Sequence, residues 1–165
     1  MKVFEKFSKK NDIKIEKVID IGCRWGKALK YWKNNNIEAY GVEVSKTMVD
    51  YCEKRNLKCY LASATNLSMF KDKIFDLYMA TDIYEHLRTK DLKYAIDEAK
   101  RVTKKYLLIR PYPSIDKRKR LHLTIWNLEK WESFFKKHNL EIIKVGSKGK
   151  TTYRHVFLME IKKGN

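Results

Sequence analysis

The chain has 165 residues, of which 44% are hydrophobic and 35% are charged, so we expect a folded chain rather than a disordered one. Its 37 lysine and arginine residues outnumber 20 acidic residues, and the formal net charge is +17. This excess favours a negatively charged partner such as nucleic acid. The length is typical of a single domain, which we expect to span residues 1–165.

The three cysteines, Cys23, Cys52 and Cys59, form neither a C-x-x-C pair nor the pattern of a zinc site, which favours a reducing, cytoplasmic location. The first ten residues alternate apolar residues with lysines, unlike a signal peptide. No segment approaches the ~20 apolar residues that cross a bilayer. We therefore expect no membrane span, no metal site, and a monomer or homodimer.

Short β-rich runs alternate with amphipathic runs of helix length along the chain. Ser45 is expected to cap the helix that follows it. In chain order we predict a strand over Lys17–Ile21, a helix over Lys27–Lys33, a strand over Glu38–Val42, a helix over Lys46–Arg55, strands over Lys58–Ala62 and Phe75–Ala80, a helix over Asp91–Val102, a strand over Tyr106–Arg110, a helix over Leu128–Asn139, and strands over Glu141–Val145 and Tyr153–Ile161.

Strands that alternate with helices imply right-handed crossovers and a parallel sheet. Gly146 and Gly149, between the last two strands, indicate a hairpin that adds one antiparallel strand. The sequence therefore predicts an α/β fold, doubly wound, with a mostly parallel seven-stranded sheet and a C-terminal antiparallel hairpin.

The loop after the first predicted strand contains Gly22 and Gly26, with Arg24 between them and Asp20 just before. Doubly wound sheets bind ligands at the carboxyl ends of their strands, and glycine lets the backbone approach a ligand closely. Asp20 can accept hydrogen bonds from a ligand ammonium group. A dinucleotide site would need G-x-G-x-x-G, so the spacing disfavours a nicotinamide-dependent reductase. An ordinary strand-to-helix turn is the other alternative.

Glu43 closes the second predicted strand, about twenty residues after the glycine loop. An acid at this position can accept hydrogen bonds from the two hydroxyls of a ribose. A glutamate at a strand end is usually only solvated. Its spacing of about twenty residues from the glycine loop nevertheless favours a ligand-binding role.

Five segments resemble, in order and spacing, the motifs of class I S-adenosylmethionine (SAM)-dependent methyltransferases. The likeness is closest to the methyltransferase type 11-like group, which carries an E-H-L motif after the fourth strand. It runs from about Val18 to the C-terminus, and it implies a Rossmann-like fold, SAM as the cofactor and methyl transfer as the reaction. The segments are Asp20-Ile21-Gly22-Cys23, Gly41-Val42-Glu43-Val44-Ser45, Phe75-Asp76-Leu77, Glu85-His86-Leu87 and Glu98-Ala99-Lys100-Arg101-Val102.

The resemblance also implies roles for single residues. The loop residues would hold the methionine half of SAM, Glu43 the ribose and Val44 the adenine, while Ala80-Thr81-Asp82 would line the methyl-transfer site. The predicted cofactor-binding residues are Asp20, Gly22, Cys23, Arg24, Gly26, Glu43, Val44, Ser63, Ala64, Ala80 and Thr81.

The chain departs from the family pattern at two of these positions. Arg24 replaces a glycine, so either the loop is wider or the guanidinium meets the SAM carboxylate. Ser63 stands where the family usually has an aspartate for the adenine amino group. After Asp82, Ile83-Tyr84 differs from the P-P-[YF] tail of adenine amino-methyltransferases.

Methyl transfer from a cationic sulfur needs alignment of donor and acceptor, and a base only where the nucleophile must lose a proton. Asp82 and His86 are the candidate catalytic residues. The alternative for His86 is a role in packing and hydrogen bonding at the start of a helix, without a part in catalysis.

The acceptor is expected to enter over the carboxyl ends of the fourth and fifth strands. Four consecutive basic residues there could meet phosphate, and Tyr112 and Trp126 could stack on a base. A solvated basic loop is the alternative. The candidate substrate-binding residues are Arg110, Tyr112, Lys117, Arg118, Lys119, Arg120 and His122.

Three hypotheses about function stay open on the sequence. The first is a methyltransferase of an anionic acceptor, with nucleic acid ahead of small anions. The second is a methyltransferase of an uncharged small molecule. The third is a non-catalytic nucleic-acid-binding protein on a decayed methyltransferase fold, with Arg24 and Ser63 as the lesions.

Overall fold

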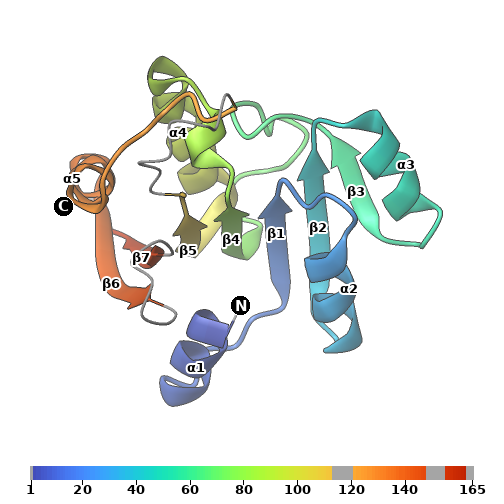
Figure 1. Cartoon of the computed structure of the whole chain (residues 1–165). Coiled ribbons are helices and arrows are strands. Elements are labelled where there is room, and N and C mark those ends of the chain that lie inside the picture. Colours follow the sequence, from blue (N-terminus) through green and yellow to red (C-terminus); the bar gives the residue numbers. More distant parts are fainter. Residues whose placement is uncertain (1, 113–120, 148–154, 163–165) are drawn as a thin grey trace.

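The computed structural model describes residues 2–112, 121–147 and 155–162. In this part of the chain one seven-stranded sheet has the order β3-β2-β1-β4-β5-β7-β6 (Figure 1). Neighbours among the first five strands in this order are parallel, and β7 is antiparallel to both β5 and β6. The predicted fold is therefore confirmed. The strands are β1 (Lys17–Ile21), β2 (Glu38–Glu43), β3 (Lys58–Leu61), β4 (Phe75–Thr81), β5 (Thr103–Arg110), β6 (Leu140–Ser147) and β7 (His155–Ile161).

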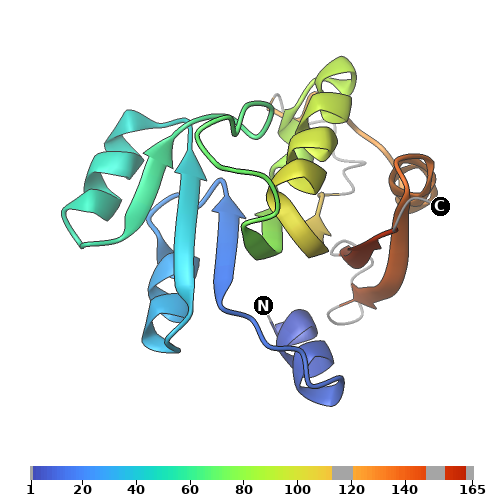
Figure 2. The ribbon, with the colours of Figure 1, turned by 180° about the vertical axis from the view of Figure 1, so that it is seen from behind.

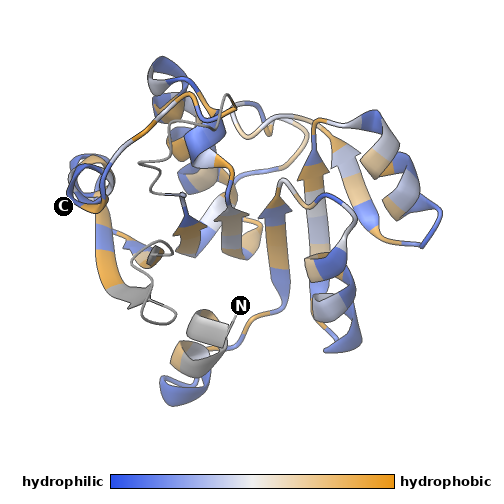
Figure 3. Ribbon diagram, in the orientation of Figure 1, coloured by the Kyte–Doolittle hydropathy of each residue, from blue (hydrophilic) through white to orange (hydrophobic). Residues whose placement is uncertain are grey.

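Helices cover both faces of the sheet, as the two opposite views show (Figures 1 and 2). One apolar cluster joins the sheet to α1 (Lys2–Lys10), α2 (Lys27–Asn34) and α3 (Lys46–Glu53). A second cluster joins the other face to α4 (Leu92–Val102) and α5 (Leu128–Lys137). Apolar residues concentrate in the strands and polar ones on the outer helix surfaces (Figure 3). This distribution follows from burying one stripe of each helix against the sheet.

The parallel register aligns the carboxyl ends of the three central strands. Ile21 of β1 lies opposite Val42 of β2 on one side and Ala80 of β4 on the other. The loops that leave these strands therefore share one edge of the sheet, here called the carboxyl edge. Ligands of doubly wound sheets bind at this edge.

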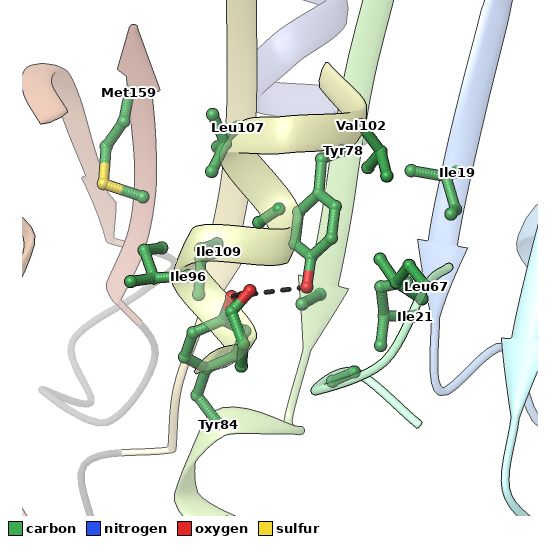
Figure 4. Close-up of a cluster of buried hydrophobic side chains, with 14 of the residues drawn as sticks. Ile19, Ile21, Leu67, Tyr78, Tyr84, Ile96, Val102, Leu107, Ile109 and Met159 are labelled. Atoms are coloured by element: carbon green, nitrogen blue, oxygen red, sulfur yellow. Dashed lines mark hydrogen bonds between the residues drawn. The ribbon is translucent and has the colours of Figure 1, made fainter. Parts of the chain in front are cut away.

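A short 3-10 helix, η1 (Tyr84–His86), follows β4 and anchors the E-H-L segment to the core. The hydroxyls of Tyr78 and Tyr84 are 3.3 Å apart within the second cluster (Figure 4). The Tyr84 hydroxyl also donates to the Ala95 carbonyl of α4 at 3.4 Å. Because Tyr84 is fully buried, the neighbouring residues Glu85 and His86 are held at a defined place beside the carboxyl edge.

The sequence analysis predicted no helix before β1, and the structure has α1 there. Phe4 is 1% exposed and its ring lies 6.0 Å from the ring of Tyr106. The signal was weak because a helix of nine residues carries only a short apolar stripe between its lysines.

Element bounds differ from the predicted ones by a few residues. β5 begins at Thr103, directly after α4, rather than at Tyr106, and α3 ends at Glu53 rather than Arg55. Ser45 is the N-cap residue of α3, but its side chain makes no capping hydrogen bond. The Glu43 carboxylate accepts instead from the backbone N–H groups of Val44 and Ser45, which precede the helix.

Some predictions fall on residues outside the described part. They concern the basic run 117–120, the glycine at 149 and the first residues of the last predicted strand. Within the described ranges, the search for a helix long and apolar enough to span a membrane finds none.

Candidate cofactor site at the carboxyl edge of the sheet

The glycine loop turns tightly because three of its residues have positive φ. These are Gly22 (φ 69°), Arg24 (φ 50°) and Gly26 (φ 68°). A Cβ on Gly22 would lie 2.0 Å from Cδ1 of Ile83, and one on Gly26 would lie 2.6 Å from Cδ1 of Leu57. Both glycines are thus required by conformation and by close packing. The Gly22 N–H donates to the Val42 carbonyl at 2.7 Å, which ties the loop to the end of β2.

The Glu43 carboxylate is the polar centre of this edge. It is 7% exposed and accepts hydrogen bonds from the backbone N–H groups of Arg24 (3.0 Å), Val44 (2.8 Å) and Ser45 (3.0 Å). These three donors hold the group in one position between the glycine loop and α3. Its two oxygens offer about four acceptor sites, so it retains capacity for a ligand hydroxyl.

A cavity of about 300 Å³ opens beside Glu43. Its volume suits a small-molecule ligand. Val44 forms one wall and is 72% exposed, an apolar side chain left open to the cavity. The Ser63 hydroxyl, which also lines it, is 2.9 Å from the Thr65 hydroxyl. The lining residues are Ile21, Gly22, Val42, Glu43, Val44, Ala62, Ser63, Ala64, Ile83, His86 and Leu87.

Of the residues predicted to bind the cofactor, Gly22, Glu43, Val44, Ser63 and Ala64 come together around this cavity. His86, predicted as a catalytic candidate, lines it as well. Gly22 follows β1, Glu43 and Val44 lie at the end of β2, and Ser63 and Ala64 follow β3. The parallel register therefore brings distant segments of the chain to one place.

Three other predicted cofactor residues do not line the cavity. Asp20 is 6% exposed. Its neighbours in β1, Ile19 and Ile21, point into the cluster on the α4 and α5 face of the sheet. Side chains alternate along a strand, so Asp20 faces α2 and α3. Burial raises the pKa of Asp20 to about 7. The Cys23 thiol is turned into the core, 3.2 Å from the Cys59 sulfur. Ala80 is fully buried in the core beneath the edge.

The remaining loop residues lie at the edge of the site without lining the cavity. The backbone of Arg24 holds Glu43, while its side chain is exposed to solvent. Gly26 is buried under the loop, where it caps the start of α2. Thr81 is the last residue of β4 and is half-buried.

A polar group of side chains lies at the ends of β4 and β5, next to the cavity. Asp82 has φ 58° and its carboxylate forms an ion pair with Arg110, while its N–H donates to the Arg110 carbonyl at 2.8 Å. The His86 and His122 ring centres are 4.8 Å apart, and those of Tyr112 and His122 are 5.4 Å apart. We call Asp82, His86, Arg110, Tyr112 and His122 the mouth.

Glu85, which the sequence analysis did not single out, lies directly beneath the mouth. It is fully buried, and its backbone carbonyl accepts from the N–H groups of Leu123 (2.9 Å) and Thr124 (3.0 Å). Burial raises the pKa of its carboxyl to about 7. The only signal in the sequence was its place in the E-H-L motif, which says nothing about burial.

A larger hollow of about 440 Å³ lies away from the mouth, between α4 and the segment after β3. The Arg101 guanidinium on its wall already bonds Glu98, Asp72 and the carbonyls of Leu67 and Phe70. Its polar groups satisfy one another, so we assign this hollow a structural role.

Comparison with known proteins agrees with the fold. Residues 19–108 match the family described as "Methyltransferase domain". Over 87 residues the chain is 36% identical to an uncharacterized protein, MJ1123, from Methanocaldococcus jannaschii, a match that covers 53% of this chain and 39% of that relative. The chain thus spans well under half of the length of this curated relative.

Solved structures of similar fold have low sequence identity. A SAM-dependent methyltransferase from Clostridium acetobutylicum superposes with a TM-score of 0.79 at 14% identity, covering 98% of this chain and 89% of that one. The protein PH0226 from Pyrococcus horikoshii has a TM-score of 0.78 at 20% identity, with the same two coverages. Magnesium protoporphyrin IX methyltransferase from Synechocystis with bound SAM has a TM-score of 0.73 at 15% identity, with coverages of 98% and 77%.

The fold is the Rossmann-like doubly wound α/β sheet of the methyltransferase structures on which the chain superposes. The family match covers more than half of the sequence, and the chain belongs to the methyltransferase-domain family. This membership confirms the predicted methyltransferase class.

Proposed function

We propose that this chain binds SAM in the cavity beside Glu43 and transfers its methyl group to a negatively charged acceptor at the mouth. The observation that carries the proposal is the content of the cavity at the carboxyl edge. It combines a fixed carboxylate for the ribose hydroxyls with the exposed apolar side chain of Val44 for the adenine ring. His86 belongs to both the cavity and the mouth, so donor and acceptor would meet there.

Two observations support an anionic acceptor, with nucleic acid ahead of small anions. The formal net charge is +17. The basic run Lys117–Arg120 lies in the sequence between Tyr112 and His122, whose rings are in contact. Tyr112 and His122, which flank the run in the sequence, thus belong to the mouth, where phosphate contacts would steer an acceptor.

A second candidate acceptor is an uncharged small molecule. Three apolar side chains on or near both sides of His122 in the sequence are exposed. They are Leu121, Leu123 and Ile125, which are 75%, 58% and 53% exposed. Such an apolar strip favours an acceptor with an apolar body, which would remove these side chains from water.

Calorimetric titration of S-adenosylhomocysteine, the demethylated product, tests the cofactor site. We expect Glu43→Ala to weaken binding by at least about 1 kcal/mol, the scale of a hydrogen bond to a charged group. Glu53→Ala is the matched control, because Glu53 is an exposed glutamate at the end of α3. Equal affinity of the Glu43 variant and the wild type would contradict the ribose assignment.

Transfer of isotope-labelled methyl groups tests the activity and the acceptor class. Label is expected in the nucleic-acid fraction of a cell extract, or in small anions, when the protein and labelled SAM are added. Label confined to uncharged small molecules would favour the second candidate. Binding of the cofactor product without any transfer would favour a non-catalytic protein on a decayed fold.

A further inference from the structure

Three side chains suited to metal coordination meet where two residues of the mouth lie over Glu85. Their ligand atoms, one each from Glu85, His86 and His122, all lie within 4.8 Å of one another. Glu85 and His86 belong to η1, whereas His122 lies beyond β5 in the sequence. The hydrogen bonds from Leu123 and Thr124 to the Glu85 carbonyl join the two segments, so the three ligands are held together by backbone.

The Glu85 carboxylate is the first observation that points to a cation. The residue is 0% exposed. The backbone N–H groups of Glu85 and Tyr112 lie near its carboxylate, but neither oxygen accepts a hydrogen bond of good geometry from the described residues. Arg110 acts on it only through space, because that guanidinium is paired with Asp82. Buried carboxylates are normally paired, hydrogen-bonded or bound to a metal.

The orientation of His86 is the second such observation. Its Nδ1 lies 2.9 Å from the carbonyl oxygen of Leu121. A carbonyl oxygen only accepts, so we assign the ring proton to Nδ1, which leaves the lone pair of Nε2 for a ligand. A histidine whose second nitrogen donates to a backbone carbonyl is the usual arrangement of a metal-binding imidazole.

The other cluster of potential ligands, Cys23, Cys52 and Cys59, is a weaker candidate. Its three sulfur atoms also lie within 4.8 Å of one another. The thiols are part of the apolar cluster under α2 and α3, and the free thiols of Cys23 and Cys59 already share a hydrogen bond. The Glu85 cluster instead has an exposed member, His86, that lines the cofactor cavity.

We propose that Glu85, His86 and His122 bind a divalent first-row transition metal ion. Two imidazoles and one carboxylate suit Zn²⁺, Co²⁺, Mn²⁺ and Fe²⁺, and they leave coordination positions open. The open side would face the cavity that His86 lines. Around a tetrahedral ion with ligands at about 2.1 Å, ligand atoms are about 3.4 Å apart. The three ligand atoms would therefore draw closer together on binding than the 4.8 Å within which they lie in the structure.

The place of the ion implies a role that rests on the proposed methyl transfer. An acceptor hydroxyl bound at an open position would lose its proton to water more readily. Its oxygen would then attack the methyl carbon of SAM. The oxygen–carbon bond forms as the carbon–sulfur bond breaks, and the electron pair of that bond returns to the sulfur. The acceptor class is therefore one that presents a hydroxyl group.

Titration of the untagged, reduced protein with Co²⁺, followed by visible absorption, tests the metal site. We expect one ion per chain and weak d–d bands, without the intense charge-transfer band of a cobalt–thiolate bond. His86→Asn and Glu85→Gln are each expected to weaken binding at least tenfold. His138→Asn, at the end of α5, is the matched control and is expected to bind like the wild type.

Three results would overturn the proposal. They are no Co²⁺ binding by the wild type, equal binding by the His86 and control variants, and a thiolate band that Cys59→Ser removes. His86 is exposed, so its replacement leaves the core intact even where Glu85→Gln impairs folding. Titration with S-adenosylhomocysteine is the separate readout of the cofactor site. Intact Co²⁺ binding with no cofactor binding would contradict the proposed function alone.

Discussion

Three buried carboxyl groups near the carboxyl edge differ in what surrounds them. Glu43 accepts three backbone hydrogen bonds, which fix its position where a ribose would bind. Asp20 and Glu85 are as deeply buried, and burial raises the pKa of each to about 7. A buried carboxyl group thus serves as a fixed acceptor in Glu43, whereas in Asp20 and Glu85 burial disfavours ionisation.

The raised pKa of Asp20 makes stability depend on pH. Between its ordinary value of 3.8 and about 7, the folded state keeps a proton that the unfolded state has released. Stability is therefore expected to fall as the pH rises through this window and to stay lower above it. The loss has an upper limit of about 4 kcal/mol. Asp20→Asn cannot ionise, so we expect it to be more stable than the wild type at pH 8.

Urea unfolding at pH 5 and pH 8 checks this expectation, with Asp12→Asn at an exposed position as the control. If Asp20→Asn follows the pH dependence of the wild type, the Asp20 carboxyl is not the source of that dependence.

At the scale of elements, α1 adds stability far from the cofactor site. It lies at the edge where the strands begin, opposite the carboxyl edge (Figure 1). Phe4 and Phe7 both contact the ring of Tyr106 on β5. The helix closes one end of the apolar cluster that also holds α2 and α3.

Phe4→Ala is therefore expected to lower the free energy of unfolding by about 3 kcal/mol, the lower end of the range for a buried phenylalanine. Affinity for S-adenosylhomocysteine should stay unchanged in the folded variant, because α1 does not contact the cavity. Chemical denaturation and calorimetry provide the two measurements. Lys9→Ala, an exposed change on the same helix, should alter neither quantity. A loss below about 0.5 kcal/mol for Phe4→Ala would show that α1 is not docked in solution.

At the scale of the whole molecule, the excess of positive charge bears on the acceptor. Neutralising phosphates releases counterions, so binding of nucleic acid should fall steeply with salt. Replacing all four residues of Lys117–Arg120 by alanine is expected to reduce the logarithmic salt slope for single-stranded RNA by about 3. Cofactor affinity is expected to stay unchanged, because the carboxylate and the apolar wall proposed to hold the cofactor, Glu43 and Val44, lie at the end of β2.

Fluorescence anisotropy over a series of salt concentrations measures this slope. The matched control removes four exposed lysines elsewhere, at Lys9, Lys10, Lys30 and Lys33. If both quadruple variants lower the slope equally, the charge acts without a preferred site. If neither does, a small-molecule acceptor is favoured.

Much of the fold and half of the cofactor site could be predicted from residues that act locally. Alternating strands and helices predicted the parallel sheet, because each amphipathic run must bury its stripe against a neighbour. Gly22 and Gly26 marked the tight loop, and Glu43 marked the end of β2, because chain geometry constrains these positions within a few residues.

The tertiary structure decided what depends on burial and on contacts between distant segments. Asp20 is one strand position away from facing the cavity, and the alternation of side chains turns it into the core. Glu85 lies in a motif that was visible in the sequence, yet its burial depends on packing against a segment beyond β5. Its approach to His122 likewise depends on that segment returning over β4. No periodicity in a single sequence encodes such a contact, because it arises from the order of strands in the folded sheet.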